Sequence, residues 1–211
     1  MDSLPFRIVL ASTSPARRRL LGRAGFSFDV IPPNVEEPKG DGVTDVRRFV
    51  QQLAWLKAQA VADQLHNPAL GPTVVLAADT VGWFQGQVIG KPEDEADALR
   101  IIGMLAGTRH QLWTGVCLWL LPANRQICWQ EQSLLEMTPM SSSELDAYIK
   151  SEAWRGHSGG YAIEESGNDP LVKVVEGTVS NVIGLPMESL EAVFAQLKNT
   201  VSLFSCVPSY H

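Results

Sequence analysis

The chain begins with a short apolar run that gives way to a helical pattern. Residues 6–11 are mostly apolar and predict a strand, and residues 14–24 predict a helix that ends at Gly25. Ser14 is a favourable N-cap residue, because its hydroxyl accepts from a free backbone N–H, and Pro15 suits the first helical position. The pattern therefore predicts a strand that turns tightly into a helix N-terminus.

Two further strands are expected on either side of a long amphipathic helix. Alternating apolar residues over 27–32 predict the first of these strands. Thr44 is expected to cap a helix over about 44–66, whose apolar side chains recur at helical spacing. The run TVVLAA at 73–78 is apolar without alternation, which is typical of a strand buried on both faces.

The rest of the chain predicts hairpins and shorter helices. A hairpin is expected to turn at Gln85 and Gly86, between two stretches that favour strands. The remaining predicted elements are a helix over 92–105 with Pro92 at its start, long strands at 110–121 and 126–137, a helix from Ser141 or Ser143 to about 152, a strand at 171–175 and a last helix near 187–198.

The order of these elements predicts an α/β protein. Strands alternate with helices in the first part of the chain and follow one another in the second, so a mixed central sheet with flanking helices is expected. The composition does not change sharply along residues 1–199, so this stretch is expected to form one domain, with residues 200–211 as a C-terminal tail.

Composition and charge indicate an ordinary globular protein. The 211 residues are 45% hydrophobic and 19% charged, with a net charge of −6, and such an acidic protein is not expected to coat nucleic acid. No apolar run reaches the length of a membrane span, and the N-terminus lacks the pattern of a signal peptide. We therefore expect a cytoplasmic protein with no nucleic-acid partner and no membrane partner.

The three cysteines agree with that compartment. Cys117, Cys128 and Cys206 have no CxxC spacing, so a structural metal held by them is not expected. We interpret them as reduced thiols, as is usual in the cytoplasm.

Basic residues stand at a helix start, where acidic ones are favoured. Arg17, Arg18 and Arg19 follow the predicted N-cap, although the partial positive charge of a helix N-terminus disfavours cations. Free backbone N–H groups at such a terminus bind anions, and Ser12 and Arg17 can add a hydroxyl and a bidentate guanidinium. We interpret Arg17 as a phosphate ligand and the next two arginines as solvated surface residues.

Two lysines occupy similarly unusual positions. Lys57 lies on the apolar stripe of the helix predicted over 44–66. A lysine there either extends its ammonium group past the apolar surface or meets an anion, and the sequence leaves both open. Lys91 stands in IGKP, at the predicted start of the helix over 92–105. A bound phosphate nearby would account for both lysines.

Carboxylates follow two of the predicted strands. Asp79 comes directly after the strand at 73–78, and Glu36 and Glu37 lie in the loop after the strand at 27–32. Ligands of open α/β sheets gather at the carboxyl ends of strands, where a carboxylate can hold Mg²⁺ or act as a general base. Each residue alone is also consistent with an ordinary loop charge. Together with the cations, they indicate a polyphosphate–metal site.

The motifs occur in the order typical of one known family. LASTSPARRRLL, VEE, LKAQAVA, LAADTV, IGKP and GLP follow one another. The sequence resembles the Maf family of nucleoside triphosphate pyrophosphatases over about residues 6–190. The resemblance implies an elongated, two-lobed α/β fold with a cleft between the lobes. It also implies hydrolysis of a nucleoside triphosphate between its α and β phosphates, a divalent metal (Mg²⁺ or Mn²⁺) as cofactor and, often, a homodimer.

The resemblance also implies roles for individual residues. Asp79 matches the aspartate taken as the general base, and with Glu36, the motif glutamate, it is expected to hold the metal. The residues that match the family's substrate-binding positions are Ser12, Arg17, Lys57 and Lys91.

One motif departs from the usual pattern and leaves the base open. The family commonly has DKAGAYxIQ where this chain has GHSGGYAIE at 156–164, so Glu164 stands where glutamine is usual. A carboxylate only accepts hydrogen bonds, which favours a base edge that presents donors, as in the 7-methyl-GTP branch. In contrast, ADT at 78–80 resembles the dTTP/UTP branch. Glu164 is expected to bind substrate, with the base unassigned.

Other departures keep a different function class open. Ala16 replaces the first arginine of the usual SxSPRR, and Gly156 and His157 replace the usual Asp and Lys. The alternative hypothesis is a nucleotide-binding regulator of cell division that has lost catalysis. Because a pure binding protein has no need of a general base, the presence of Asp79 together with both lysines favours an enzyme.

Overall fold

A long mixed β-sheet forms the centre of the molecule, which the computed structural model describes over residues 4–65, 71–163 and 169–200. Seven strands run in the order β2-β1-β3-β5-β6-β7, with β4 paired to β3. The first two strands and β3 pair in parallel, and all later pairings are antiparallel. The predicted mixed α/β sheet is confirmed. The strands are β1 (Arg7–Leu10), β2 (Phe28–Val30), β3 (Thr73–Phe84), β4 (Gln87–Ile89), β5 (Arg109–Leu121), β6 (Arg125–Met137) and β7 (Val172–Glu176).

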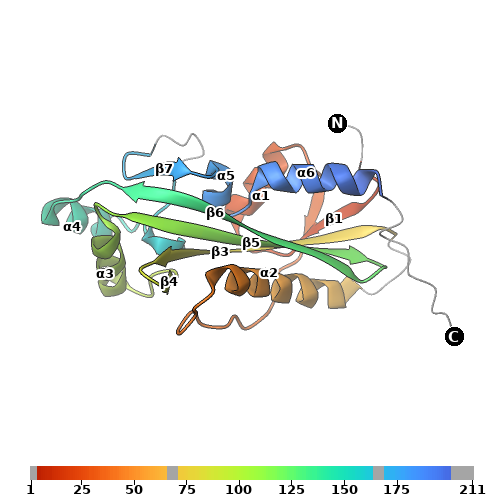
Figure 1. Ribbon diagram of the computed structural model, residues 1–211, viewed down its shortest axis with the longest axis horizontal. Helices are drawn as coiled ribbons and strands as arrows, with labels where there is room; N and C mark the ends of the chain where they lie inside the picture. The colour runs from red at the N-terminus through yellow and green to blue at the C-terminus, as the bar shows by residue number, and fades with distance from the viewer. Residues whose placement is uncertain (1–3, 66–70, 164–168, 201–211) are drawn as a thin grey trace.

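Helices cover both faces of this sheet. The helices are α1 (Pro15–Arg23), α2 (Val46–Ala62), α3 (Glu95–Leu105), α4 (Ser142–Lys150), α5 (Val179–Ile183) and α6 (Met187–Lys198), with short 3-10 turns at Asp63–Leu65 and Ser158–Gly160. In Figure 1 the molecule is elongated along β3, β5 and β6, with α1 and α6 on one face of the sheet and α2 on the other. Helices α3 and α4 lie at the opposite end from α6.

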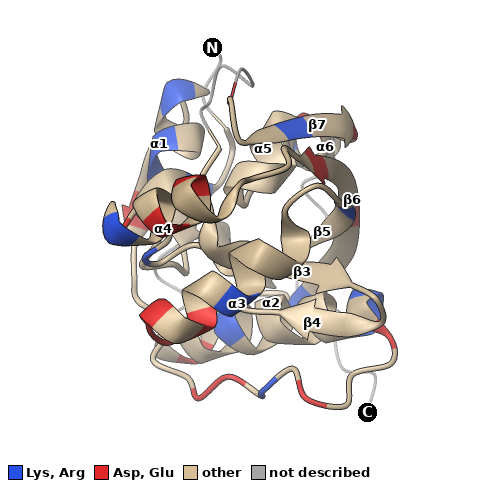
Figure 2. Ribbon diagram, turned by 90° about the vertical axis from the view of Figure 1, so that its left-hand side faces the viewer, with Lys and Arg blue, Asp and Glu red and all other residues tan. Residues whose placement is uncertain are grey.

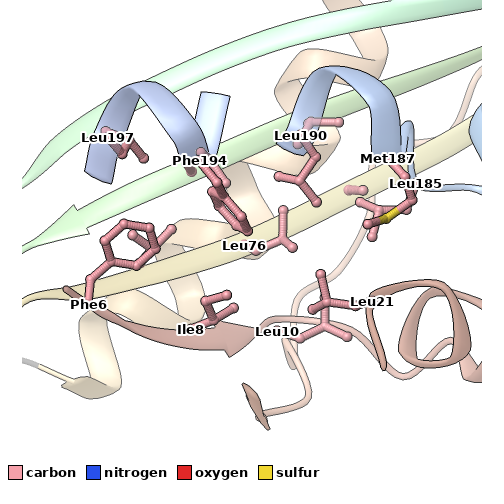
Figure 3. Close-up of a cluster of buried hydrophobic side chains, with 14 of the residues drawn as sticks. Phe6, Ile8, Leu10, Leu21, Leu76, Leu185, Met187, Leu190, Phe194 and Leu197 are labelled. Carbon is pink, nitrogen blue, oxygen red and sulfur yellow. The ribbon is translucent and has the colours of Figure 1, made fainter. Parts of the chain in front are cut away.

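Side-chain alternation along the inner strands separates two core layers. On β3, Val74 and Leu76 belong to a cluster with residues of α1 and α6, and Figure 3 shows Leu76 close to Phe194 of α6. The intervening Val75 and Ala77 pack against α2 instead. Because successive residues of a strand point to opposite faces, the position of a residue on β3 decides which helices it meets.

A further hydrophobic cluster forms the core of the other end of the molecule. Ile102 and Leu105 of α3 pack there against Leu112 of β5 and Leu135 of β6. Figure 2 views this end and shows Lys, Arg, Asp and Glu mainly on the helices and on the outer loop, while the strands are mostly uncharged. Each end of the molecule therefore has hydrophobic clusters of its own, and the long strands run through both ends.

Several element boundaries differ from the predicted ones. Helix α2 is capped by Asp45, whose carboxylate accepts from two backbone N–H groups, so the prediction of Thr44 was wrong. Helix α3 likewise begins after its cap Asp94 and not at Pro92. A carboxylate next to the first helical residue reaches the free N–H groups directly. The short helix α5 was not predicted.

Two further expectations concern the C-terminal tail and membrane-spanning helices. The tail predicted at 200–211 lies, apart from residue 200, outside the described residues. Within the described ranges, no helix combines the length and the apolar character needed to cross a membrane.

Candidate active site

The site is built on the middle of β3. We expected Asp79 to follow the end of a strand, but β3 continues through it to Phe84, because these residues pair with β5. The parallel neighbour β1 ends opposite Leu76, and β4 pairs with β3 only from Gly82 onward. No strand in the described ranges covers the edge of β3 between these points. Asp79 and Thr80 therefore border an opening in the sheet.

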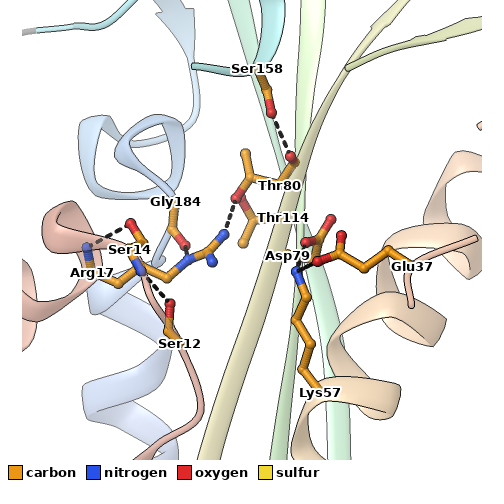
Figure 4. Close-up of polar contacts among 10 residues, drawn as sticks. All are labelled: Ser12, Ser14, Arg17, Glu37, Lys57, Asp79, Thr80, Thr114, Ser158 and Gly184. Carbon is orange, nitrogen blue, oxygen red and sulfur yellow. Dashed lines mark hydrogen bonds and ion pairs between the residues drawn. The ribbon is translucent and has the colours of Figure 1, made fainter. Parts of the chain in front are cut away.

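Alternation along β3 sends these two neighbours to different helices. Asp79 faces α2 and contacts Lys57, whereas Thr80 faces α1 and contacts Arg17. Figure 4 shows the two cations on opposite sides of the strand. The strand thus brings a lysine and an arginine from separate helices to one place.

Lys57 meets two carboxylates. Its side chain is 10% exposed, and its Nζ forms an ion pair with Asp79, whose side chain is also 10% exposed. The same Nζ lies 2.9 Å from Oε1 of Glu37, which is half-exposed in the loop before α2. Of the two alternatives that the apolar stripe left open, the structure has the lysine paired with anions.

Arg17 is held in place by a directed chain of hydrogen bonds. Its Nε donates to the carbonyl oxygen of Gly184 at 2.7 Å, and its Nη2 donates to Oγ1 of Thr80 at 3.1 Å. The hydroxyl of Thr114 lies 2.9 Å from that of Thr80 and donates to the carbonyl oxygen of Asn181 at 3.1 Å. Thr80 therefore donates to Thr114 and accepts from the guanidinium, so each hydroxyl has one orientation.

The charge of Arg17 is retained despite its surroundings. Burial lowers the pKa of Arg17 from its ordinary value, while the negative charges of Asp79 and Glu37 oppose that change. A guanidinium stays protonated throughout the physiological range. Arg17 is therefore a permanent cation beside the carboxylates.

The N-terminus of α1 lies at the same place. Ser14 caps the helix and accepts from the backbone N–H of Arg17, and Ser12 accepts from the backbone N–H of Ser14 at 3.1 Å. Ser12 is buried, and Pro15 occupies the first helical turn. This is the arrangement in which backbone N–H groups and hydroxyls bind an anion.

A pocket of about 820 Å³ joins these groups. Its volume lies within the range of small-molecule sites, about 300–1,000 Å³. One wall is the start of α1 and another is the stretch Gly156–Ile163, which comes from the opposite end of the molecule. The predicted site residues that line it together are Ser12, Arg17, Lys57, Asp79 and Lys91.

Known proteins resemble this chain over most of its length. A profile of the family described as Maf-like protein matches residues 7–197. The chain belongs to the Maf family. A dTTP/UTP pyrophosphatase of Anaeromyxobacter dehalogenans (strain 2CP-C) is 38% identical over 192 residues, covering 89% of this chain and 92% of its own. A dTTP/UTP pyrophosphatase of Ruminiclostridium cellulolyticum is 31% identical over 194 residues, covering 92% and 97%.

A solved structure supports the fold alone. The Ham1 protein of Staphylococcus aureus superposes with a TM-score of 0.51 at 16% identity, covering 92% of this chain and 98% of its own. At this identity the likeness concerns the arrangement of helices and strands.

Two predicted residues of this Maf-family chain are not part of the described pocket. Glu36 is exposed and is not among the lining residues, whereas its neighbour Glu37 lines the pocket and reaches Lys57. Glu164 lies outside the described residues. The metal-binding role of Glu36 and the substrate-binding role of Glu164 remain predictions.

The carboxylates of the pocket suit a divalent metal whose other ligands come from the substrate and from water. In the described ranges, no group of three or more His, Cys, Asp and Glu side chains is arranged to hold a metal by itself. Asp79 and Glu37 converge on one Nζ inside the pocket. Mg²⁺ commonly binds through one or two carboxylates, with water and phosphate oxygens completing its shell. The donor set therefore fits a metal that arrives with a polyphosphate.

The wall opposite α1 is fixed by a histidine of β5 and by two residues of the stretch Gly156–Ile163. Tyr161 is buried, and its hydroxyl lies 2.6 Å from Nε2 of His110 on β5. Burial lowers the pKa of His110 to about 4, so the ring is neutral at physiological pH. Ser158 donates to the carbonyl oxygen of Thr80 at 2.9 Å, which ties the wall to the open edge of β3.

His157 stands at the mouth of the pocket near other basic groups. Partial burial, then Lys91 and Arg19, lower the pKa of its imidazole from the ordinary value. Three basic side chains from two ends of the molecule thus approach one another at this rim.

Gly184 allows the close approach on which Arg17 depends. Its φ is +118°, a conformation that favours glycine, and an added Cβ would lie 3.2 Å from Oγ1 of Thr80 and 3.4 Å from Nε of Arg17. The GLP motif therefore has a physical reason at its glycine. Thr80, Thr114 and Gly184 are site residues to which sequence reasoning gave no role, whereas Glu37 was named beside Glu36 as a possible metal ligand.

Proposed function

We propose that this chain is a nucleoside triphosphate pyrophosphatase of the dTTP/UTP type, which hydrolyses the bond between the α and β phosphates. One observation carries the proposal: Lys57 pairs with Asp79 on one face of β3 and Arg17 binds Thr80 on the other, and all four residues line one pocket of nucleotide size. The relatives named dTTP/UTP pyrophosphatase support this class and the choice of base.

The cations of the pocket would hold the triphosphate. Arg17 keeps N–H groups beyond those bound to Gly184 and Thr80, and these can donate to phosphate oxygens with the backbone N–H groups of α1. Lys57 and Lys91 add positive charge on the other sides of the pocket. Because fixed cations offset the charge that develops in phosphoryl transfer, their placement would supply much of the rate enhancement.

Asp79 would act on the attacking water. Its carboxylate accepts the proton as the water oxygen bonds to the α-phosphorus, and the bond from that phosphorus to the bridging oxygen breaks. The products are a nucleoside monophosphate and pyrophosphate. Lys57, whose Nζ is paired with Asp79, holds the carboxylate in place before the reaction.

Asp79 and Glu37 would hold Mg²⁺ or Mn²⁺ together with the substrate, and Glu36 remains the alternative partner. When bound, a divalent ion would neutralise charge on the phosphate oxygens and on the leaving pyrophosphate. Equilibrium dialysis with Mn²⁺ and a non-hydrolysable triphosphate would separate the two glutamates. Glu37→Gln is expected to weaken Mn²⁺ retention, and Glu36→Gln, one position away, serves as the matched variant.

The alternative of a catalytically inactive regulator of cell division is not favoured. The relatives carry the name of an activity, and Asp79 lies in the pocket with both lysines. A regulator would bind nucleotide in this pocket without releasing pyrophosphate. This difference gives the deciding experiment.

That experiment measures pyrophosphate release from dTTP, UTP, GTP and 7-methyl-GTP with Mg²⁺ or Mn²⁺. We expect release from dTTP and UTP, and release about 100- to 10,000-fold slower from the Asp79→Asn variant. Release confined to 7-methyl-GTP would overturn the choice of base. Nucleotide binding without release from any of the four would instead support the regulator.

A homodimer and a cytoplasmic location complete the proposal. The homodimer comes from the family resemblance, and the location comes from the cysteines, which we interpret as reduced thiols. Light scattering on the purified protein tests the dimer, and fractionation of expressing cells tests the location.

A further inference from the structure

Two cysteines lie side by side on neighbouring strands, and neither lines the pocket. Cys117 of β5 and Cys128 of β6 are register partners, and both are free thiols. Register partners of antiparallel strands point to the same face, with Cα atoms about 4.5 or 5.5 Å apart. A disulfide accepts Cα separations of about 4.4–6.8 Å. These strands can therefore be bridged without a change of register.

The two thiols differ in their access to solvent. Cys117 is fully buried and packs with Ala54 and Ala58 of α2, whereas Cys128 is exposed. A hydrogen bond from Cys117 lowers the pKa of Cys128, and the same bond, together with burial, raises the pKa of Cys117. Cys128 is therefore the thiol that a dissolved reagent reaches and the one that ionises first.

Packing around Cys117 restricts what oxidation can produce there. The neighbouring core is closed, since Ala54, Ala58 and Ala77 are fully buried. Groups added to a buried side chain in such a core displace its neighbours. A disulfide between Cys117 and Cys128 adds no atoms to the side chain of Cys117. This interior therefore accommodates the disulfide better than a form of Cys117 that carries added oxygen atoms.

We propose that these cysteines form an oxidation site, in which Cys128 reacts with a hydroperoxide and Cys117 converts the product into a disulfide between β5 and β6. An exposed, readily ionised thiol beside a second thiol is the usual arrangement of such sites. The disulfide would lie on the face of the sheet that α2 covers.

Each step balances. The Cys128 thiolate attacks one peroxide oxygen, an S–O bond forms, the O–O bond breaks, and the other oxygen leaves with a proton as water or an alcohol. The sulfur of Cys117 then attacks the sulfenic acid, an S–S bond forms, the S–O bond breaks, and water leaves with the Cys117 proton. The two thiols are oxidised together by two electrons, and the hydroperoxide is reduced.

The test uses the full chain with Cys206→Ser, so that Cys117 and Cys128 are the two remaining thiols. The protein is exposed to hydrogen peroxide, alkylated, and analysed by mass spectrometry without reductant. We expect a loss of two hydrogen atoms from the intact mass, no alkylation, and a peptide that joins residues 117 and 128. Dithiothreitol is expected to separate that peptide.

Two variants distinguish the roles of the thiols. In Cys117→Ala the exposed thiol has no partner, so dimedone is expected to trap it as a sulfenic acid. In Cys128→Ser the buried thiol is expected to stay reduced under the same treatment. The proposal is overturned if the parent protein accumulates sulfinic acid on Cys128 while Cys117 is still alkylated. It is also overturned if both thiols survive a peroxide dose that oxidises free glutathione.

Discussion

Lys57 and Asp79 show why single charged residues can be stable in an apolar layer. Each side chain is only 10% exposed, and an unpaired charge at such a depth would cost several kcal/mol. Each charge offsets part of this cost for the other, and Glu37 adds a second carboxylate at 2.9 Å from Nζ. The charges therefore meet in the protein without substrate, at residues that line the pocket.

Replacing Asp79 by asparagine tests the general base. The amide keeps the size and an acceptor for Lys57, but it cannot take the proton of the attacking water. We expect Asp79→Asn to lower kcat by about 100- to 10,000-fold, the usual range for a positioned base. Steady-state pyrophosphate release measures this change. Asp146→Asn, on the exposed side of α4, is the matched control, and near-normal turnover of Asp79→Asn would reject the assignment.

Replacing Lys57 by methionine tests its role toward phosphate. Methionine keeps an unbranched apolar chain and removes the ammonium group, which we expect to hold the triphosphate. A charge-assisted hydrogen bond contributes about 1.5–3 kcal/mol, so KM should rise by about ten- to a hundredfold. Lys150→Met, at an exposed site, should leave KM unchanged. If Lys57→Met lowered only the melting temperature, Lys57 would have a structural role alone.

At the scale of elements, the site depends on how closely α2 approaches the sheet. Asp79 is the register partner of Gly115 on β5. A Cβ on Gly115 would lie 2.2 Å from the backbone oxygen of Val50 in α2, closer than any real contact. The absence of a side chain at Gly115 thus lets α2 lie against β5 and brings Lys57 within reach of Asp79.

An alanine at position 115 is expected to push α2 away from the sheet. We expect Gly115→Ala to lower the free energy of unfolding by about 3 kcal/mol, at the upper end of the usual overpacking cost. Urea unfolding measures it. Gly22→Ala on α1, where an added Cβ meets nothing within 4 Å, should stabilise the chain by about 0.5–1 kcal/mol. Equal stabilities of the two variants would contradict the close approach.

At the scale of the whole molecule, the pocket depends on both ends being folded. The start of α1 belongs to one end, and Lys91 with Gly156–Ile163 belongs to the other. The second wall is attached to the sheet by the bond between His110 and Tyr161 and by the bond from Ser158 to Thr80. Loss of either attachment would move one wall relative to the phosphate-binding end.

His110 makes the stability of the whole fold depend on pH. Burial lowers its pKa from 6.5 to about 4, so between these values the unfolded chain binds a proton that the folded chain does not. The stability present above pH 6.5 should therefore fall by about 3 kcal/mol as the pH decreases through 4. Urea unfolding across this range measures the loss. His110→Gln, which does not titrate, should show a smaller slope, and identical slopes would contradict the assignment.

Local patterns in the sequence determined most of the elements and several of the site residues. Apolar residues that recur at every second position or at helical spacing form patterns among neighbours in the chain. The strands, the long helices and the hairpin at Gln85 could therefore be predicted. Arg17 and Lys57 stood out because a cation conflicts with each local position. Ser12 and Asp79 stood out because they lie beside a helix start and a predicted strand end, and the structure brings all four to one pocket.

Tertiary structure alone decided how these residues are arranged. Asp79 lies inside β3 because pairing with β5 extends the strand, and Thr114 enters the site because it is the register partner of Thr80. Arg17 and Gly184 are 167 residues apart in the chain and are joined by one hydrogen bond. Contacts of this kind depend on strand register and helix packing across the whole fold, and no local period encodes them.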